Sequence, residues 1–290
     1  MKDNALTMVN LLMLFGAAPL VCAPGAARAM NPHSAPGLIH LEPYLDEHWT
    51  FRAKIKGREE LFLMDTGGGL TAVSPEAAAE IGCEPWGQLT AFRMRGDRLD
   101  LKRCDSVEID AGAIPLRLPT TGIWDFSKML PKDAPQIAGN VGLDAFAGRI
   151  VTLDIGNRQL VIETPKSLEV RIAAAKEVPV QFIKEAEGYS TTIAAALDTP
   201  KGRIWMHLDS GDDVPITIGS HVAGALGLDP QKKGAQPLDV SLVGGVALRG
   251  SAHVKDIIFD GNIGAPVIAG WIMTMDLVHQ RLWIAPARKN

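Results

Sequence analysis

The chain has 290 residues, of which 47% are hydrophobic and 21% are charged, and its formal net charge is −4. This length and composition are ordinary for a folded soluble protein and allow one large domain or two smaller ones. The mild net charge and the lack of any Lys/Arg run in the sequence exclude nucleic acids and acidic membrane surfaces as expected partners.

The first 29 residues differ from the rest of the chain. Lys2 is followed by an apolar stretch over residues 5–22, and the small residues Ala27 and Ala29 come next. This order resembles a secretory signal peptide with cleavage after Ala29, so we expect an exported protein, either periplasmic or secreted. Stable membrane insertion is not expected after cleavage. The alternative is an uncleaved anchor, because the apolar run approaches the length that spans a bilayer.

A mature chain would keep two cysteines, Cys83 and Cys104. In an exported protein they can form a disulfide that closes a loop of about 20 residues. Two buried thiols are the alternative, because the spacing does not fix the Cα geometry that a bridge needs.

A pattern of strands and turns occurs twice along the mature chain. In each copy, alternating apolar residues, a turn with Gly or Pro and a short apolar run predict a β-hairpin. An Asp-Thr/Ser-Gly triplet and a short helix follow each hairpin. The hairpins are predicted over residues 49–64 and 190–208, the triplets are residues 65–67 and 209–211, and the helices span residues 75–81 and 221–226.

The two copies also end alike. Residues 151–162 and 273–284 align without a gap, and both have the pattern of strand, polar turn and strand. Just before these endings, an apolar pair followed by Gly at residues 137–139 matches residues 268–270. Many short strands in a duplicated order predict an all-β protein of two similar lobes.

The duplicated unit resembles the half-unit of pepsin-like and retropepsin-like aspartic proteases. Apolar strand, Asp-Thr/Ser-Gly, short helix, apolar-apolar-Gly and final hairpin occur in both copies, and the match covers roughly residues 38–286. The resemblance to a bacterial-type exported aspartyl protease implies two similar pepsin/retropepsin-like β-barrel lobes in one chain, related by internal duplication, with an active-site cleft between them. The lobes would be residues 30–166 and 167–290, after a signal peptide of residues 1–29.

This resemblance implies an aspartic-type endopeptidase, a hydrolase that cleaves a peptide or protein substrate. The catalytic pair would be Asp65 and Asp209, because two close carboxylates cannot both ionise easily and therefore share one proton. One carboxyl would take a proton from water while the other polarises the scissile carbonyl. No cofactor or metal is expected, since the seven His residues are scattered and form no metal-binding motif. Duplication within the chain makes a homodimer unnecessary, so we expect a monomer.

Other residues would support this pair. In the family, the residue after each catalytic Asp hydrogen-bonds to the opposite loop, which is the position of Thr66 and of Ser210. Gly67 and Gly211 would let the two loops approach without Cβ clashes. Turn glycines that could mark the tip of a flap over the cleft are Gly96 in the first copy and Gly244 and Gly245 in the second.

Two positions depart from the family pattern. Pepsin-like members usually carry Ser or Thr three residues after each Asp, and retropepsins carry Ala, whereas this chain has Gly68 and Asp212. Asp212 and its neighbour Asp213 add negative charge, which would raise the pKa of the pair or attract basic substrates unless both side chains point to solvent. The alternative function is therefore a catalytically inactive peptide-binding protein of the same fold.

Overall fold

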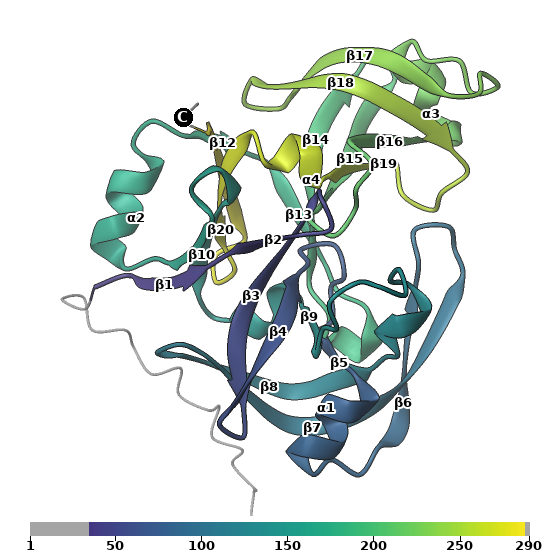
Figure 1. The fold of residues 1–290 in the computed structure, drawn as a ribbon. Helices are drawn as coiled ribbons and strands as arrows, with labels where there is room; N and C mark the ends of the chain where they lie inside the picture. The colour runs from purple at the N-terminus through teal and green to yellow at the C-terminus, as the bar shows by residue number, and fades with distance from the viewer. Residues whose placement is uncertain (1–34, 288–290) are drawn as a thin grey trace, which may run out of the picture. The chain divides into compact units, whose positions relative to one another are not determined.

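Short strands dominate the computed structural model, which describes residues 35–287 (Figure 1). The predicted signal peptide of residues 1–29 and its alternative, an uncleaved anchor, lie outside the described residues. No helix between residues 35 and 287 is long and apolar enough to cross a membrane.

The first copy of the repeat forms an eight-stranded sheet. Its long strand β7 also pairs with β3, at Asp110 and Lys54, so that the sheet closes on itself. Near its centre, β9 runs parallel to β4 and antiparallel to β5, and β5 runs parallel to β8. The strands, in sheet order, are β2 (Glu42–Tyr44), β3 (His48–Ile55), β4 (Arg58–Met64), β9 (Gly139–Val141), β5 (Ala72–Val73), β8 (Ile114–Ile123), β7 (Arg98–Ala111) and β6 (Trp86–Phe92).

The second copy forms a seven-stranded sheet with the same central order. Here β19 runs parallel to β15 and antiparallel to β16, and β16 runs parallel to β18. The strands, in sheet order, are β13 (Val180–Ile183), β14 (Thr192–Thr199), β15 (Gly202–Asp209), β19 (Gly261–Gly264), β16 (Ile216–Gly219), β18 (Val246–Lys255) and β17 (Ala235–Leu242). The two lobes therefore share one central strand order. In each, a strand from later in the lobe, β9 or β19, lies between the strand that leads to the Asp and the strand that follows the Asp.

A third sheet, of six strands, takes three strands from each half of the chain. Its two middle strands, β10 and β20, are antiparallel, with Thr152 opposite Thr274 and the two hydroxyl oxygens 2.9 Å apart. The strands, in sheet order, are β1 (Gly37–His40), β11 (Gln159–Ile162), β10 (Ile150–Asp154), β20 (Trp271–Asp276), β21 (Arg281–Pro286) and β12 (Lys176–Val178). This sheet joins the two lobes, and the Thr pair lies where their strands meet.

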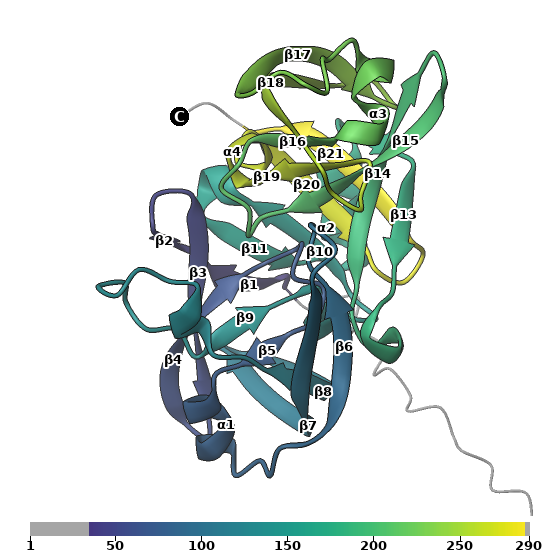
Figure 2. The same ribbon diagram turned by 90° about the vertical axis from the view of Figure 1, so that its right-hand side faces the viewer.

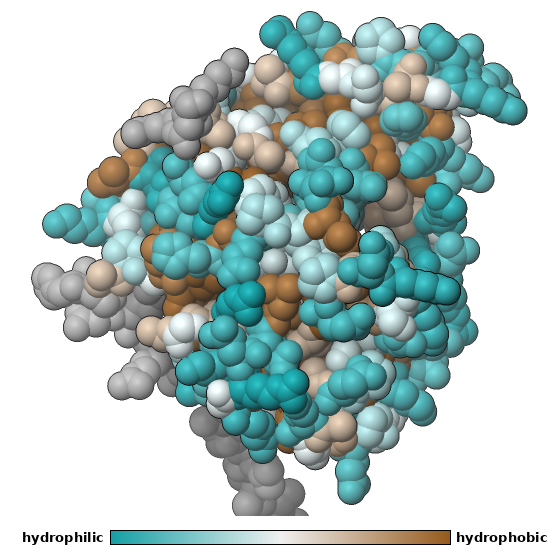
Figure 3. All heavy atoms as spheres, in the orientation of Figure 1, coloured by the Kyte–Doolittle hydropathy of each residue, from teal (hydrophilic) through white to brown (hydrophobic). Residues whose placement is uncertain are grey.

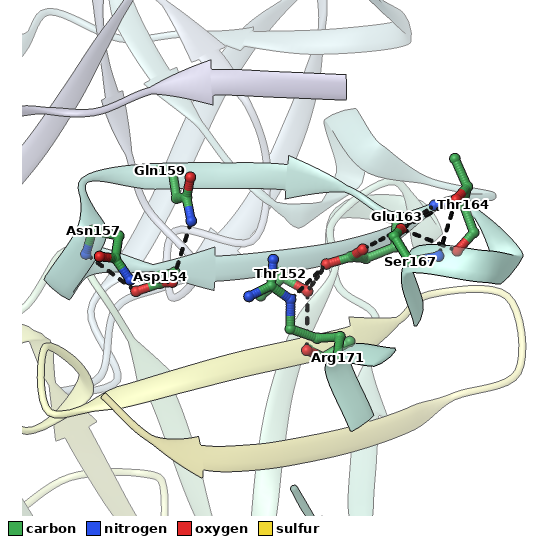
Figure 4. Close-up of polar contacts among 9 residues, drawn as sticks. Thr152, Asp154, Asn157, Gln159, Glu163, Thr164, Ser167 and Arg171 are labelled. Atoms are coloured by element: carbon green, nitrogen blue, oxygen red, sulfur yellow. Dashed lines mark hydrogen bonds and ion pairs between the residues drawn. The ribbon is translucent and has the colours of Figure 1, made fainter. Parts of the chain in front are cut away.

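The linker between the lobes is fixed to this third sheet by a buried carboxylate, that of Glu163 (Figure 4). It accepts hydrogen bonds from Thr152 at 2.7 Å and from the Arg171 guanidinium at 3.0 Å, and also from Ser167. A capping box between Thr164 and Ser167 begins the linker helix α2 (Pro165–Ile172) at this point. The charge of Glu163 is thus paired and hydrogen-bonded, as a buried carboxylate requires.

The remaining helices are short. Helix α1 (Pro75–Ile81) has the predicted bounds: the Ser74 hydroxyl caps its start, and Gly82 ends it with φ +76°. The matching helix of the second copy is divided at Gly224 into α3 (Ser220–Ala223) and η5 (Gly224–Leu226). The others are η1 (Phe126–Lys128), η2 (Leu143–Phe146), η3 (Ile155–Asn157), η4 (Ala186–Gly188) and α4 (Ala265–Ile268).

Most buried apolar side chains belong to one core shared by both lobes, which includes Phe51 and Phe62 from the first lobe and Met206 from the second, and a smaller cluster contains Leu70, Leu89, Leu101 and Ala186. The face of the molecule in Figure 3 is mostly hydrophilic, with apolar residues in scattered groups. The predicted fold class is confirmed: the protein is mostly β, with two similar lobes that repeat one strand order.

Candidate active site

The loops after β4 and β15 meet face to face and carry Asp65 and Asp209. A Cβ atom at Gly67 would lie 2.1 Å from Cγ of Asp209, and one at Gly211 would lie 2.6 Å from Cγ of Asp65. Real Cβ atoms do not approach carboxyl carbons so closely, and only glycine leaves room for each loop against the opposite carboxyl. The structure thus brings together two carboxyls that are far apart in the sequence.

Four hydrogen bonds between the loops hold this arrangement. The Thr66 hydroxyl donates to the carbonyl oxygen of Leu208 at 2.7 Å and accepts from the N–H of Ser210 at 3.0 Å. The Ser210 hydroxyl donates to the carbonyl oxygen of Met64 at 3.0 Å and accepts from the N–H of Thr66 at 3.0 Å. Each side chain thus satisfies two buried backbone groups of the opposite lobe.

The two carboxyls are surrounded by protein atoms, although each residue keeps some accessible surface. Burial raises the pKa of Asp65, against hydrogen bonds from the N–H groups of Gly68 and Gly67 and from Asp209, which lower it. Burial also raises the pKa of Asp209 well above its usual range, and the charges of Asp65 and Asp212 raise it further. Two carboxyls held this close cannot both ionise easily, which is the condition for sharing one proton.

Two asparagines lie beside these loops and were missed by the sequence analysis. Asn140 is on β9 and Asn262 is on β19, and the segments Gly-Asn-Val-Gly and Gly-Asn-Ile-Gly around them occupy the same place in the two lobes. The predicted match of residues 137–139 with residues 268–270 is therefore wrong. Extending the gap-free alignment of the two endings upstream would have paired the asparagines.

Asp212 takes part in the site, whereas Asp213 is exposed. The Asn262 amide donates to Oδ2 of Asp212 at 2.7 Å and to Oδ2 of Asp209 at 3.3 Å. The other oxygen of Asp212 accepts the N–H of Val214 at 3.0 Å, which fixes the carboxylate. The sequence left open whether Asp212 and Asp213 add charge to the site or point to solvent. In the structure only Asp213 is exposed, and Asp212 adds its charge to the site.

The β6–β7 hairpin reaches the second lobe, and its tip contains Gly96. The carbonyl oxygen of Met94 accepts the N–H of Ile258 at 3.0 Å, and a Cβ at Gly96 would lie 3.1 Å from the Ile258 side chain. Gly96 has φ +86°, a conformation that favours glycine. This hairpin therefore connects the first lobe to the loop before β19 and is the candidate flap.

Gly244 and Gly245 lie at the tip of a different hairpin, β17–β18, which is at the top of both views (Figures 1 and 2). A Cβ at Gly244 would lie 2.4 Å from the carbonyl oxygen of Glu177, and Lys176 donates to the carbonyl of Gly245 at 2.5 Å. Because β18 occupies the place of β8, this turn corresponds to the β7–β8 turn, and the structure does not bring it to the carboxyl pair.

Cys83 and Cys104 form a disulfide bond, with their Cα atoms 5.9 Å apart. The bond ties the chain just after α1 to β7, the strand that continues into the candidate flap.

His207, on the same strand as Asp209, is a packed side chain. Its ring stacks on Phe259 with the ring centres 3.7 Å apart, and burial lowers its pKa to about 4. Between residues 35 and 287, no group of three or more His, Cys, Asp or Glu side chains is placed to hold a metal ion.

Comparisons with known proteins support the fold alone. No family model matches the chain, and no curated protein matches it. Among solved structures, basic 7S globulin from soybean is similar with a TM-score of 0.56 and 9% sequence identity, over 86% of this chain and 94% of that one.

These comparisons overturn the family assignment made from the sequence. The assignment to an aspartic protease family, of the bacterial exported type, is wrong, because no family model supports it and the similar structure is that of a globulin. The sequence analysis took the repeated Asp-Thr/Ser-Gly unit as a mark of family, although a short motif on a fold can persist in proteins with different functions. What the chain shares with the soybean globulin is the pepsin-like fold.

Proposed function

We propose that the protein is an aspartic-type endopeptidase whose active groups are Asp65 and Asp209. The observation that supports this most is the pair itself: two carboxyls enclosed by protein atoms, with raised pKa values, each packed against a glycine of the opposite loop. Perturbed carboxyls held in a fixed pair are typical of acid–base catalysis. The pair supports a peptidase independently of any family assignment.

In the proposed reaction, the ionised carboxyl takes a proton from a water molecule, whose oxygen attacks the carbonyl carbon of the peptide bond. The protonated carboxyl gives its proton to the carbonyl oxygen, which forms a gem-diol. The carbon–nitrogen bond then breaks. The leaving nitrogen takes the proton gained from water, and a diol hydroxyl returns its proton to the second carboxyl. The hydrogen bonds of Thr66 and Ser210 keep the two acids in register throughout.

A second candidate is a peptide-binding protein of the same fold that does not cleave its ligand. Two observations favour it: the similar solved structure is that of a globulin, and a third carboxylate, Asp212, stands beside the pair. In this case the surface around the carboxyl pair would hold an extended peptide without turnover.

The deciding experiment incubates the wild type and the variants Asp65→Asn and Asp209→Asn with a complex peptide mixture between pH 3 and pH 7. Mass spectrometry then identifies the cleavage products. Asp133→Asn, in an exposed loop, is the matched control. Cleavage by the wild type and the control, with loss in both pair variants and unchanged circular dichroism, supports the peptidase. Undiminished cleavage by Asp65→Asn refutes it.

Peptides that bind the wild type and are recovered intact favour the second candidate. A transition-state mimic of aspartic peptidases, pepstatin, adds a second measurement, because tight binding together with turnover rules out the inert protein. We also propose that the protein is exported and acts as a monomer. Cell fractionation and sedimentation of the mature chain test these two points.

A further inference from the structure

The two halves of the site have the same frame but different polar groups. In both, an asparagine on the crossing strand stands beside the loop that carries the carboxyl. Asn140 is bonded to backbone: its amide donates to the carbonyl of Leu70 at 3.3 Å, and its oxygen accepts the N–H of Ala72 at 3.2 Å. The first asparagine therefore has no hydrogen bond to Asp65.

The second asparagine is bonded to carboxyls instead. Asn262 is 1% exposed, and its amide donates to Oδ2 of Asp212 at 2.7 Å and to Oδ2 of Asp209 at 3.3 Å. Because one NH₂ group serves both oxygens, the position of Asp212 sets the direction in which Asn262 reaches Asp209. The Val214 N–H at 3.0 Å holds the other oxygen of Asp212.

The first half of the site cannot contain an equivalent carboxylate. The matching position is Gly68, where a Cβ would lie 2.5 Å from Oδ2 of Asp65 and 2.8 Å from the Asn140 amide. Gly68 contributes a backbone N–H to Asp65 at 2.7 Å, beside that of Gly67 at 3.0 Å. Asp65 thus receives two backbone donors, whereas Asp209 receives one, the N–H of Gly211 at 2.9 Å, and the longer Asn262 bond of 3.3 Å, and it has a third carboxylate nearby.

We propose that Asp212, whose carboxylate is held beside Asp209 by the shared Asn262 amide, is a positioning residue whose charge keeps the shared proton on Asp209 and leaves Asp65 as the base. This inference rests on the proposed function and deepens it. A negative charge close to a carboxyl favours its protonated form, and donors to a carboxyl favour its ionised form. The two halves therefore hold the proton unequally, and the singly protonated pair persists to higher pH than it would without Asp212.

The other charged groups around the pair agree with this direction or stand apart from it. His48 lies on the Asp65 side, with Nε2 3.1 Å from the carbonyl oxygen of Gly211, and its electrostatic contribution lowers the pKa of Asp65. Asp213 is exposed, and the buried His207 ring is stacked on Phe259.

The substitution Asp212→Asn tests the charge while keeping the size of the side chain and an oxygen for the Asn262 amide. Loss of the negative charge should move the alkaline limb of the pH profile of kcat/KM down by about one pH unit. Asp212→Glu keeps the negative charge, so its alkaline limb should lie close to that of the wild type. Asp213→Asn removes the same charge from the adjacent exposed residue and should leave the limb in place.

The proton affinity of the pair can also be read without activity, from the ¹³C chemical shifts of labelled Asp carboxyls during a pH titration. Asp212→Asn should lower the pH at which the pair loses its shared proton, and Asp65→Asn should identify which signals belong to the pair. Thermal unfolding checks each fold, and Asp212→Ser replaces Asp212→Asn if the latter is unstable. Equal shifts for Asp212→Asn and Asp213→Asn, or no shift in either, overturn the inference. If the wild type cleaves no peptide, the proposed function fails while the titration still tests Asp212.

Discussion

Replacing Thr66 with Val removes the hydroxyl that joins the two lobes at the candidate active site, while the shape of the side chain is kept. Thr66 is 0% exposed, so water does not take the place of the hydroxyl. The carbonyl oxygen of Leu208 loses its donor and the N–H of Ser210 loses its acceptor. Both backbone groups then stay buried without a partner.

The size of the effect follows from these two groups. A buried polar group left without a hydrogen bond costs about 1–3 kcal/mol, so two of them lower the free energy of unfolding by about 2–6 kcal/mol. Thr66→Ser is the matched control, because it keeps the hydroxyl and loses one methyl group, at a cost of about 1 kcal/mol. The difference between Val and Ser isolates the hydrogen bonds from the packing.

Urea unfolding followed by tryptophan fluorescence and by circular dichroism measures both variants. The same test on the other loop compares Ser210→Ala with the wild type, since this hydroxyl serves Met64 and Thr66 in the same way. If Thr66→Val is as stable as Thr66→Ser, the hydroxyl does not satisfy buried groups, and the account of how the lobes are joined is refuted.

Two further predictions concern the first lobe. Burial raises the pKa of Asp144 to about 6, from an ordinary value of 3.8, so its contribution to stability is complete below about pH 4 and is lost as the pH rises through 6. In the wild type, this group should lower the free energy of unfolding by about 3 kcal/mol as the pH rises from 4 to 6. Asp144→Asn should remove this decline, whereas the exposed control Asp133→Asn should keep it. Replacing Cys83 and Cys104 with Ser should lower stability by about 3 kcal/mol in urea unfolding; an unchanged midpoint would show that the disulfide does not constrain the unfolded chain.

Local sequence patterns predicted the parts of the fold that depend on neighbouring residues, such as helix ends and hairpins. Helix α1 begins after the Ser74 cap and ends at Gly82, as its capping residues indicate. The hairpins before each Asp follow from period-two alternation between Gly and Pro turns. The second helix was predicted as one element, but Gly224 lies at its middle and the helix continues only as a 3₁₀ turn.

Strand pairing could not be predicted in the same way, because it depends on which strands meet in space. The turns at Gly96 and Gly244 looked equivalent in the sequence, since each has glycine between apolar runs. In the structure the first lobe has one strand more, β6, and only its hairpin reaches the opposite lobe. No periodic pattern records that extra strand, so the correspondence of the two turns was not available from the residues.

The asparagines show a different reason for a missed residue. Asn140 and Asn262 lie on short buried strands, where a polar side chain is unexpected and therefore informative. The sequence analysis aligned the wrong glycines and left both asparagines out of the site. The gap-free register of the two chain endings contained the signal, but the role of Asn262 depends on Asp212, which comes from another loop.

The cost of the carboxyl pair bears on the choice between a peptidase and an inert binding protein. Asp65 and Asp209 both have raised pKa values in the folded protein, so their contribution to stability is lost as the pH rises through those values. A protein that only holds a peptide needs neither acid, and Asn in both positions would keep hydrogen-bonding groups without the charge. The arrangement that destabilises the fold is the one that acid–base chemistry requires, which favours the peptidase.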